Sequence, residues 1–322
     1  MEPRVVLTAC VAYTITATSL NVYNISRRGK AQSAKSSRVF DGAVILHNIL
    51  LAVYSAWTFC GMIGVMRRSM ISPSGPGGLQ ATVESLCRMH GREEMLSSVL
   101  FNPADADWKN SQKQALAAGF AAQGTRGHIW NEGLSYYGWL FYLSKIYEVV
   151  DTFIVLAKGK VASTLQIYHH AGAILSLWAG IRFMSPPIWL FVTINSFIHA
   201  VMYTYYTLKA LAIHVPGVLK QLLTTMQIIQ LFTGITYASA HLFVSFRVPV
   251  PELSNSKGSA VQDGETIGYV TQPCLSTYNQ AFAIGLNVAY LLPLTWLFIA
   301  FYVKSYFKRR QGGQSAKKGK VA

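Results

Sequence analysis

Residues 165–183 read LQIYHHAGAILSLWAGIRF, and this stretch decides how the chain must fold. It is long and apolar enough to cross a lipid bilayer, which takes about 20 such residues. Its first turns nevertheless carry Gln166, His169 and His170, which the period of an α-helix brings to one face. Polar groups are costly inside a membrane and usually face the interior of a helix bundle. The stretch therefore predicts a membrane helix with a functional face.

Comparable apolar stretches recur along the chain, at residues 5–24, 41–65, 135–157, 187–208, 221–245 and 277–303. The composition agrees, because only 13% of the residues are charged, whereas a soluble domain usually has about 25%. We therefore expect an all-α polytopic membrane protein with about seven transmembrane helices. Residues 1–322 should form one membrane domain, with a loop containing short helices at 66–134 and a basic tail at 304–322.

The net charge of +15 comes mainly from lysines and arginines between and after the apolar stretches. We expect no nucleic-acid partner, because no nucleic-acid-binding motif is present and the positive-inside rule explains the pattern. Basic residues concentrate in loops 25–40, 158–164 and 209–220 and in the tail. This predicts a cytosolic C-terminus, a lumenal N-terminus and a lumenal 66–134 loop. Arg67 and Arg68 oppose this orientation, although charges in long loops count little.

The tail ends with Lys318 and Lys320 at positions typical of a dilysine retrieval signal of the endoplasmic reticulum. A merely solvated basic tail is the alternative. The sequon Asn24-Ile25-Ser26 should face the cytosol and stay unglycosylated.

Polar side chains also interrupt three other apolar stretches at helical spacing. They are Lys145, Glu148, Asp151 and Thr152; Asn195, His199, Met202, Tyr203 and Tyr206; and Thr224, Gln227 and Gln230. An ion-pair network, an aromatic packing stripe and interhelical hydrogen bonds are the respective structural alternatives. At about 1.5 Å per residue, Asp151 and His169 lie at similar depth below the same surface. We therefore expect the four clusters to meet in one chamber near the cytosol.

In their order along the chain, these clusters resemble the signature boxes of the ELO family of very-long-chain fatty-acid elongases. The family pattern KxxExxDT matches Lys145, Glu148, Asp151 and Thr152. The HxxHH box matches at His169 and His170, with Gln166 in place of its first histidine. The remaining boxes resemble NxxxHxxMYxYY, at Asn195, His199, Met202, Tyr203, Tyr205 and Tyr206, and TxxQxxQ, at Thr224, Gln227 and Gln230.

The resemblance implies six of seven helices around an acyl tunnel in the endoplasmic-reticulum membrane. It also implies an acyltransferase, a 3-oxoacyl-CoA synthase without a cofactor or metal. Such an enzyme condenses long-chain acyl-CoA with malonyl-CoA and releases CO2 and CoA. The family mechanism implies His169 as the carrier of the acyl group, since imidazole can act as a nucleophile near neutral pH. His170 and His199 are candidates for orienting malonyl-CoA.

The same resemblance implies substrate-binding roles for Lys145, Glu148, Asp151, Gln166, Asn195, Tyr203, Tyr206 and Gln227. Glutamine cannot titrate, so we assign no proton transfer to Gln166, although some elongases of polyunsaturated chains also have glutamine there. The resemblance also implies a disulfide between Cys87 and Cys274, for which two unpaired thiols are the alternative. Membrane lipid and the ketoreductase, dehydratase and enoyl reductase of the elongation cycle are the implied partners. Whether the chain forms a homo-oligomer stays open.

Two other classes of protein remain as alternatives. A membrane di-iron desaturase or hydroxylase needs about eight histidines in several boxes; this chain has eight, but most of them are scattered. A seven-span receptor or transporter would also carry intramembrane charges, yet no inverted repeat is visible. The length and unsaturation of the acyl chain are not determined by the sequence.

Overall fold

The computed structural model describes residues 2–27, 37–74, 78–87, 89, 99–102, 107–110, 129–251 and 267–307. The helices are α1 (Pro3–Arg27), α2 (Arg38–Ser69), α3 (Gly78–Cys87), η1 (Trp130–Leu134), α7 (Ser135–Tyr147), α8 (Val149–Ala157), α9 (Thr164–Arg182), α10 (Ile188–Ala210), α11 (Gly217–Ala240), α12 (Tyr278–Tyr302) and η2 (Val303–Phe307). The strands are β1 (Val99–Asn102), β2 (Asp107–Asn110), β3 (Ser245–Pro251) and β4 (Ile267–Pro273). Lys318, Lys320 and most of the predicted 66–134 loop lie outside the described residues.

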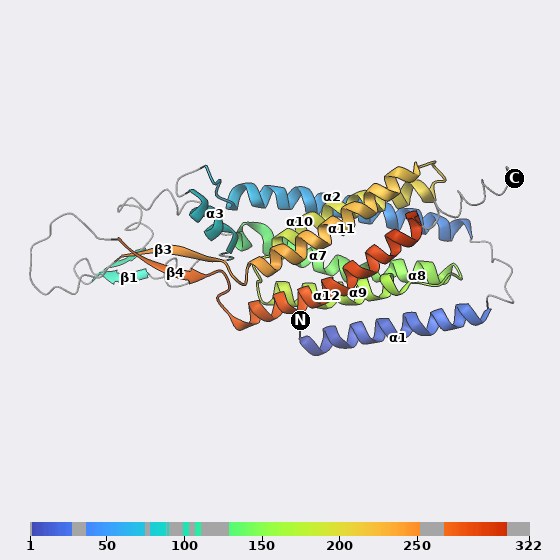
Figure 1. The fold of residues 1–322 in the computed structure, drawn as a ribbon, viewed down its shortest axis with the longest axis horizontal. Helices are drawn as coiled ribbons and strands as arrows, with labels where there is room; N and C mark the ends of the chain where they lie inside the picture. Colours follow the sequence, from blue (N-terminus) through green and yellow to red (C-terminus); the bar gives the residue numbers. More distant parts are fainter. Residues whose placement is uncertain are drawn as a thin grey trace, which may run out of the picture.

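Helices occupy all the predicted apolar stretches. Among the described helices, four are long and apolar enough to cross a membrane: α1, α2, α10, and α12 together with η2. The chain is therefore a multi-pass membrane protein. α7, α8, α9 and α11 lie within the same bundle, as Figure 1 shows. They carry most of the predicted polar clusters, which reduces their hydropathy.

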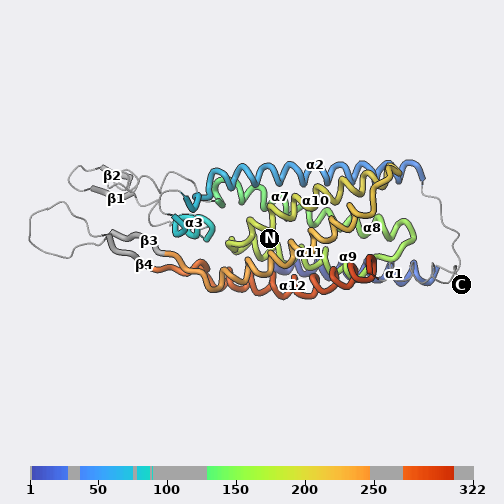
Figure 2. Tube along the Cα trace, turned by 45° about the horizontal axis from the view of Figure 1, so that its top comes forward, coloured from blue at the N-terminus to red at the C-terminus, as the bar shows by residue number. Residues whose placement is uncertain are grey.

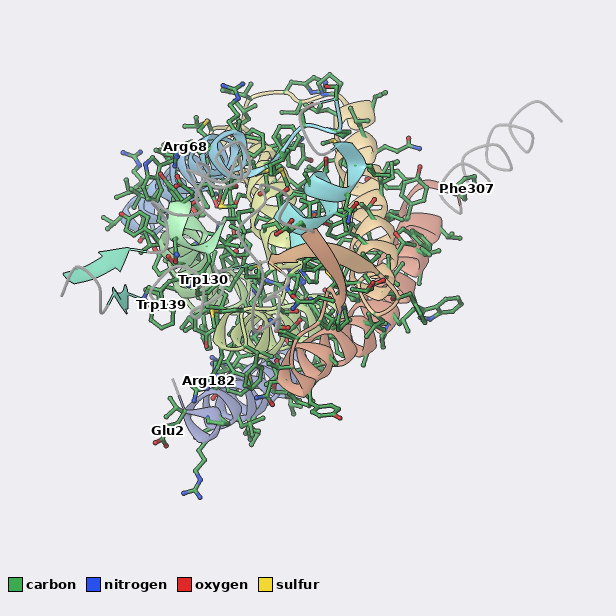
Figure 3. All side chains as sticks on the ribbon, turned by 90° about the vertical axis from the view of Figure 1, so that its left-hand side faces the viewer. Glu2, Arg68, Trp130, Trp139, Arg182 and Phe307 are labelled. Carbon is green, nitrogen blue, oxygen red and sulfur yellow. A yellow bond between two sulfur atoms is a disulfide. The ribbon has the colours of Figure 1, made fainter. Side chains whose placement is uncertain are left out.

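The bundle is a ring of helices with α1 outside it. α2, α10, α11, α12, α9 and α7 follow one another around the ring, each packed on the next, and α7 returns to α2. Figure 2 shows α2 and α12 at opposite edges. α7 also contacts α10 across the ring. α1 packs on α8 and α9, and the end-on view in Figure 3 places Glu2, beside the start of α1, at the outer edge.

Two asparagines bind the outer helix α1 to the ring. Asn21 donates to the carbonyl of Ala162 at 3.0 Å and accepts from its N–H at 2.8 Å. Asn24 donates from Nδ2 to the carbonyls of Leu156 and Lys160, both at 2.9 Å. Because Nδ2 of Asn24 is the atom that glycosylation would modify, the predicted unglycosylated state has a second physical reason. Modification would replace one of the two hydrogens of Nδ2, so at least one of these hydrogen bonds would be lost.

The structure departs from the all-α expectation in two antiparallel hairpins, β1–β2 and β3–β4. The predicted sixth helix, 221–245, ends instead at Ala240, and β3 begins at Ser245. β3 and β4 contain valine, isoleucine, threonine and aromatic residues, which favour extended structure. Their pairing places Val248 opposite Val270.

A disulfide joins Cys87, at the end of α3, to Cys274, which follows β4. This is the pairing that the family resemblance implied, and the buried side chain of Phe246 packs beside it. The disulfide links segments 187 residues apart in the sequence. It therefore closes the end of the bundle at which α9 and α11 finish and α10 and α12 begin.

The helix predicted over 135–157 is broken at Glu148. α7 ends at Tyr147 and α8 begins at Val149, and the N–H of Asp151 bonds to the carbonyl of Glu148 at 3.0 Å, a three-residue turn. The predicted common face is consequently divided. Glu148 faces α10, whereas the hydroxyl of Thr152 faces α1, where it lies 2.9 Å from Tyr13 Oη.

Candidate functional site

A charged cluster lies between α7 and α10, almost completely removed from solvent. Lys145 Nζ donates to Glu148 Oε1 at 2.8 Å and lies 3.2 Å from His199 Nδ1. Their exposed fractions are 3% for Lys145, 1% for Glu148 and 5% for His199. The ammonium also lies 4.4 Å from the centre of the Phe141 ring. An ammonium group can only donate, so a hydrogen bond from Lys145 requires His199 Nδ1 to accept. The same nitrogen also lies 3.4 Å from Glu148 Oε2, to which the other tautomer would donate.

Asp151 belongs to a second cluster, which reaches α2. Its Oδ2 accepts from the hydroxyl of Tyr203 at 2.5 Å, and its Oδ1 lies 2.8 Å from His47 Nε2. His47 Nδ1 in turn lies 3.1 Å from Tyr147 Oη. The aspartate therefore binds α2 and α10 to α8. His47 is one of the scattered histidines outside the four polar clusters, although an ionisable residue in an apolar stretch is a signal that could have identified it.

His169 lies on α9, facing α12. Its Nδ1 lies 2.9 Å from Tyr290 Oη, and the same hydroxyl lies 3.1 Å from the backbone carbonyl of His169. α9 begins at Thr164, about one turn before His169, because the side chain of Ser163 caps the helix by accepting from the N–H of Gln166 at 3.2 Å. This cap fixes the position at which the histidines enter the bundle. The ring centres of His169 and His170 are 5.5 Å apart.

An interior cavity of about 50 Å³ opens beside His169. Five helices contribute to its wall: α7, α9, α10, α11 and α12. Most of the lining is apolar, including Phe141, Leu177 and Phe191, but Lys145 and His169 are also part of it. The cavity is small beside typical ligand pockets of about 300–1,000 Å³. A long ligand would therefore have to displace side chains.

Several polar atoms in this cavity wall have no hydrogen-bond partner. They are Oγ of Ser176, Oδ1 of Asn195 and Oδ1 of Asn287, on three different helices. Leaving such an atom buried and unpaired costs about 1–3 kcal/mol. Native structures seldom tolerate this without a functional reason or a bound partner. The cavity therefore has unused capacity to bind a polar group.

The predicted site residues separate into those that line the cavity and those that do not. Lys145, His169 and Asn195 line it, and Gln230 does so from α11. Gln227 instead donates to Met202 Sδ at 3.6 Å, and Tyr206 is 42% exposed beside the Tyr203 ring. Asp151, Gln166, His170 and His199 are not part of its wall. Lys145 belongs both to the cavity wall and to the charged cluster, so the two regions adjoin.

Sequence reasoning missed Tyr290 and Asn287, both on α12. Asn287 is a lone amide in an apolar stretch, which was a usable signal. Tyr290 gave no such signal, because single tyrosines are common in membrane helices.

The described residues contain no group of three or more His, Cys, Asp or Glu side chains arranged to hold a metal ion. The di-iron alternative needs its histidines gathered around a metal site. The described histidines lie instead in the contacts given above, at the end of α11 for His241, and on the exposed segment between α10 and α11 for His214.

The family model of the GNS1/SUR4 family, named ELO, matches residues 1–314. This chain belongs to the ELO family. The match includes all four polar clusters and all the described helices of the bundle.

Individual relatives are more distant. The chain is 36% identical to human very long chain fatty acid elongase 3 over 32% of its own length and 38% of the relative's. It is 31% identical to fatty acid elongase A of Dictyostelium discoideum, over 54% of this chain and 55% of the relative. For fatty acid elongase 2 of Trypanosoma brucei brucei, the identity is 29% over 59% and 62%. The chain thus matches less than two thirds of the length of each of these relatives. No solved structure matches it.

Proposed function

We propose that this chain is a condensing enzyme of fatty-acid elongation, a 3-oxoacyl-CoA synthase. The observation that carries the proposal is an interior apolar cavity with a histidine and unpartnered polar atoms in its wall. An acyl thioester has both properties that this cavity fits, a hydrocarbon chain and a polar carbonyl. Membership of the ELO family and the names of the relatives support the same reaction.

The proposed chemistry uses His169 as the nucleophile. A ring nitrogen attacks the thioester carbonyl of acyl-CoA, the carbon–sulfur bond breaks, and CoA leaves as a thiolate that takes a proton from solvent. Malonyl-CoA then loses CO2, and the electron pair of the broken carbon–carbon bond forms an enolate. The enolate carbon attacks the acyl group on His169. A 3-oxoacyl-CoA two carbons longer forms, and the histidine is free again.

The other residues have proposed supporting roles. Asn195 lines the cavity with His169 and would donate from its amide to the oxygen that gains negative charge. Lys145 would add positive charge nearby, while Glu148 and His199 fix the position of its ammonium. The ring of helices would form the wall of the acyl tunnel, widening from the cavity as the chain enters. His170 and Gln227 remain candidates for contact with malonyl-CoA.

The proposed orientation places the C-terminus in the cytosol and the N-terminus in the lumen of the endoplasmic reticulum. Lys158, Lys160, Lys209 and Lys220 lie at or near the end of the bundle opposite the Cys87–Cys274 disulfide. Positive charge favours the cytosolic side, and disulfides persist in the oxidising lumen. The positive charge and the disulfide therefore support the same orientation. The enzymes of the remaining elongation steps, the ketoreductase, dehydratase and enoyl reductase, are the proposed partners.

The test separates acyl transfer from condensation. Purified protein is incubated with acyl-CoA alone, over a panel of chain lengths and unsaturation, and its intact mass is measured. A gain equal to one acyl group, absent in folded His169→Ala, is expected. Labelled malonyl-CoA should then convert the adduct into 3-oxoacyl-CoA. Absence of product with every acyl-CoA would overturn the proposal in favour of binding or transport. Product from His169→Ala would keep the enzyme and remove the nucleophile.

A further inference from the structure

We infer that Tyr290 is a positioning residue for His169: its hydroxyl holds the imidazole with the proton on Nδ1, so that Nε2 carries the lone pair. Nothing in the family boxes or in the predicted site points to α12 for this role. The inference deepens the proposed function and rests on it, in that Nε2 is then the atom that attacks the thioester.

The assignment follows from counting hydrogens. Tyr290 Oη carries one hydrogen and has two neighbours on His169, the backbone carbonyl at 3.1 Å and Nδ1 at 2.9 Å. The carbonyl can only accept, so the phenolic hydrogen points to it. For the second contact to be a hydrogen bond, Nδ1 must donate to the phenolic oxygen. Only the Nδ1–H tautomer satisfies both contacts together.

The surroundings of Tyr290 hold its ring in this position. A Cβ added to Gly172 would come within 2.2 Å of the Tyr290 ring, so a glycine on α9 makes the space that the ring occupies. The centre of the Tyr168 ring lies 5.8 Å from the centre of the Tyr290 ring. The Tyr168 hydroxyl also donates to the backbone carbonyl of Tyr290 at 3.2 Å. α12 is thereby attached to α9 on both sides of the histidine.

This tautomer suits the proposed chemistry. When neutral His169 attacks through Nε2, the ring gains the acyl group and a positive charge while the Nδ1 proton stays in place. The phenolic oxygen of Tyr290 accepts a stronger hydrogen bond from that cation. An acyl group on a cationic ring is also a better acyl donor than one on a neutral ring. Attack by the enolate then returns His169 to its neutral starting form.

The first arm of the test reads the tautomer without any turnover. Protein labelled with 15N in its eight histidines is examined by NMR, and the His169 signals are identified by their loss in His169→Gln. Wild type should show a protonated Nδ1 and an unprotonated Nε2 at His169. In Tyr290→Phe, the population should shift toward the Nε2–H form. An Nε2–H tautomer in wild type, or an unchanged spectrum in Tyr290→Phe, would overturn the inference.

The second arm measures kinetics. Tyr290→Phe should lower kcat by about 10–100-fold, as loss of an orienting partner typically does, with KM for acyl-CoA nearly unchanged. Tyr302→Phe is the matched control, because it removes a hydroxyl from the same helix, one that accepts from Gln221 at 2.8 Å and is not part of the cavity wall. It should keep most of the rate. Equal losses in both variants would reduce Tyr290 to a packing residue. If wild type proves inactive, the proposed function fails, while the spectrum still decides the tautomer.

Discussion

The charged cluster of Lys145 and Glu148 and the cavity beside His169 are two polar regions in one apolar bundle, and they differ in how their hydrogen-bonding capacity is used. The lysine and glutamate are almost fully buried, and they pair with each other at 2.8 Å. Glu148 Oε2 also has no hydrogen-bond partner, but it lies 3.4 Å from His199 Nδ1. The neutral atoms Ser176 Oγ and Asn287 Oδ1 of the cavity wall have no partner. A buried charge must be paired, whereas an unpaired polar atom has capacity left for a ligand.

This difference distinguishes two roles of polar residues that look alike in the sequence. A polar residue in an apolar stretch can stabilise the bundle or can bind a substrate, and hydropathy alone treats both alike. The contacts distinguish them. We therefore expect changes in the charged cluster to cost the most stability, and the loss of His169 to cost the most turnover.

The largest effect expected is on turnover. His169→Ala should reduce formation of 3-oxoacyl-CoA by at least about 1,000-fold, because removing a nucleophile removes the covalent route. His241→Ala is the control, since this buried histidine lies at the end of α11, where its Nδ1 contacts the Tyr237 carbonyl at 2.8 Å. Rates are measured with labelled malonyl-CoA. Similar losses in both variants would show that histidine loss acts through folding.

The charged cluster should give the largest loss of stability. Glu148→Ala leaves the ammonium of Lys145 buried without its carboxylate, which should lower the free energy of unfolding by about 3–5 kcal/mol. The control is Glu132→Ala, whose partner Arg68 lies on the surface with a side chain 56% exposed. That variant should lose less than about 1 kcal/mol. Both are measured by denaturation in detergent, and equal values would contradict the contrast.

Loss of the disulfide should weaken the fold at one end and leave the site intact. Cys87→Ser should lower the free energy of unfolding by about 2–4 kcal/mol, because a long loop in the unfolded chain is then no longer closed. Turnover by the folded fraction should stay close to wild type. Cys60→Ser, at an exposed free cysteine, is the control and should change neither quantity. A large fall in turnover for Cys87→Ser alone would contradict this prediction and would show that the disulfide end of the bundle affects the site.

The smallest effect should come from Asn287, whose Oδ1 has no hydrogen-bond partner. Asn287→Leu should change the free energy of unfolding by less than about 0.5 kcal/mol, or raise it, since no hydrogen bond to Oδ1 is lost. Asn24→Leu is the comparison, because its amide donates to two carbonyls. Losing them should cost about 1–3 kcal/mol. The same denaturation measurement serves both, and a larger loss for Asn287→Leu would mean that its amide is already paired.

The spacing of polar residues predicted much of the site, because residues on one helix face are related by local geometry alone. Lys145 and Glu148 do share a face, and the cap at Ser163 does place His169 just inside the bundle. The common chamber was only partly predicted. Asp151 contacts His47 on α2 and Tyr203 on α10, and no contact joins it to His169 among the hydrogen bonds described above. The break at Glu148, which spacing rules cannot show, is one cause.

By itself, the sequence determined where the long apolar helices lie, four of which are long and apolar enough to cross a membrane, and which residues are spaced along one helix face. The physical reason is that backbone groups in lipid must be satisfied within each segment, so length and hydropathy are sufficient. Only the tertiary structure decided which faces meet. The contact between His169 and Tyr290 joins residues 121 positions apart. It depends on the packing of α9 against α12, for which Gly172 makes space, and no local pattern encodes that packing.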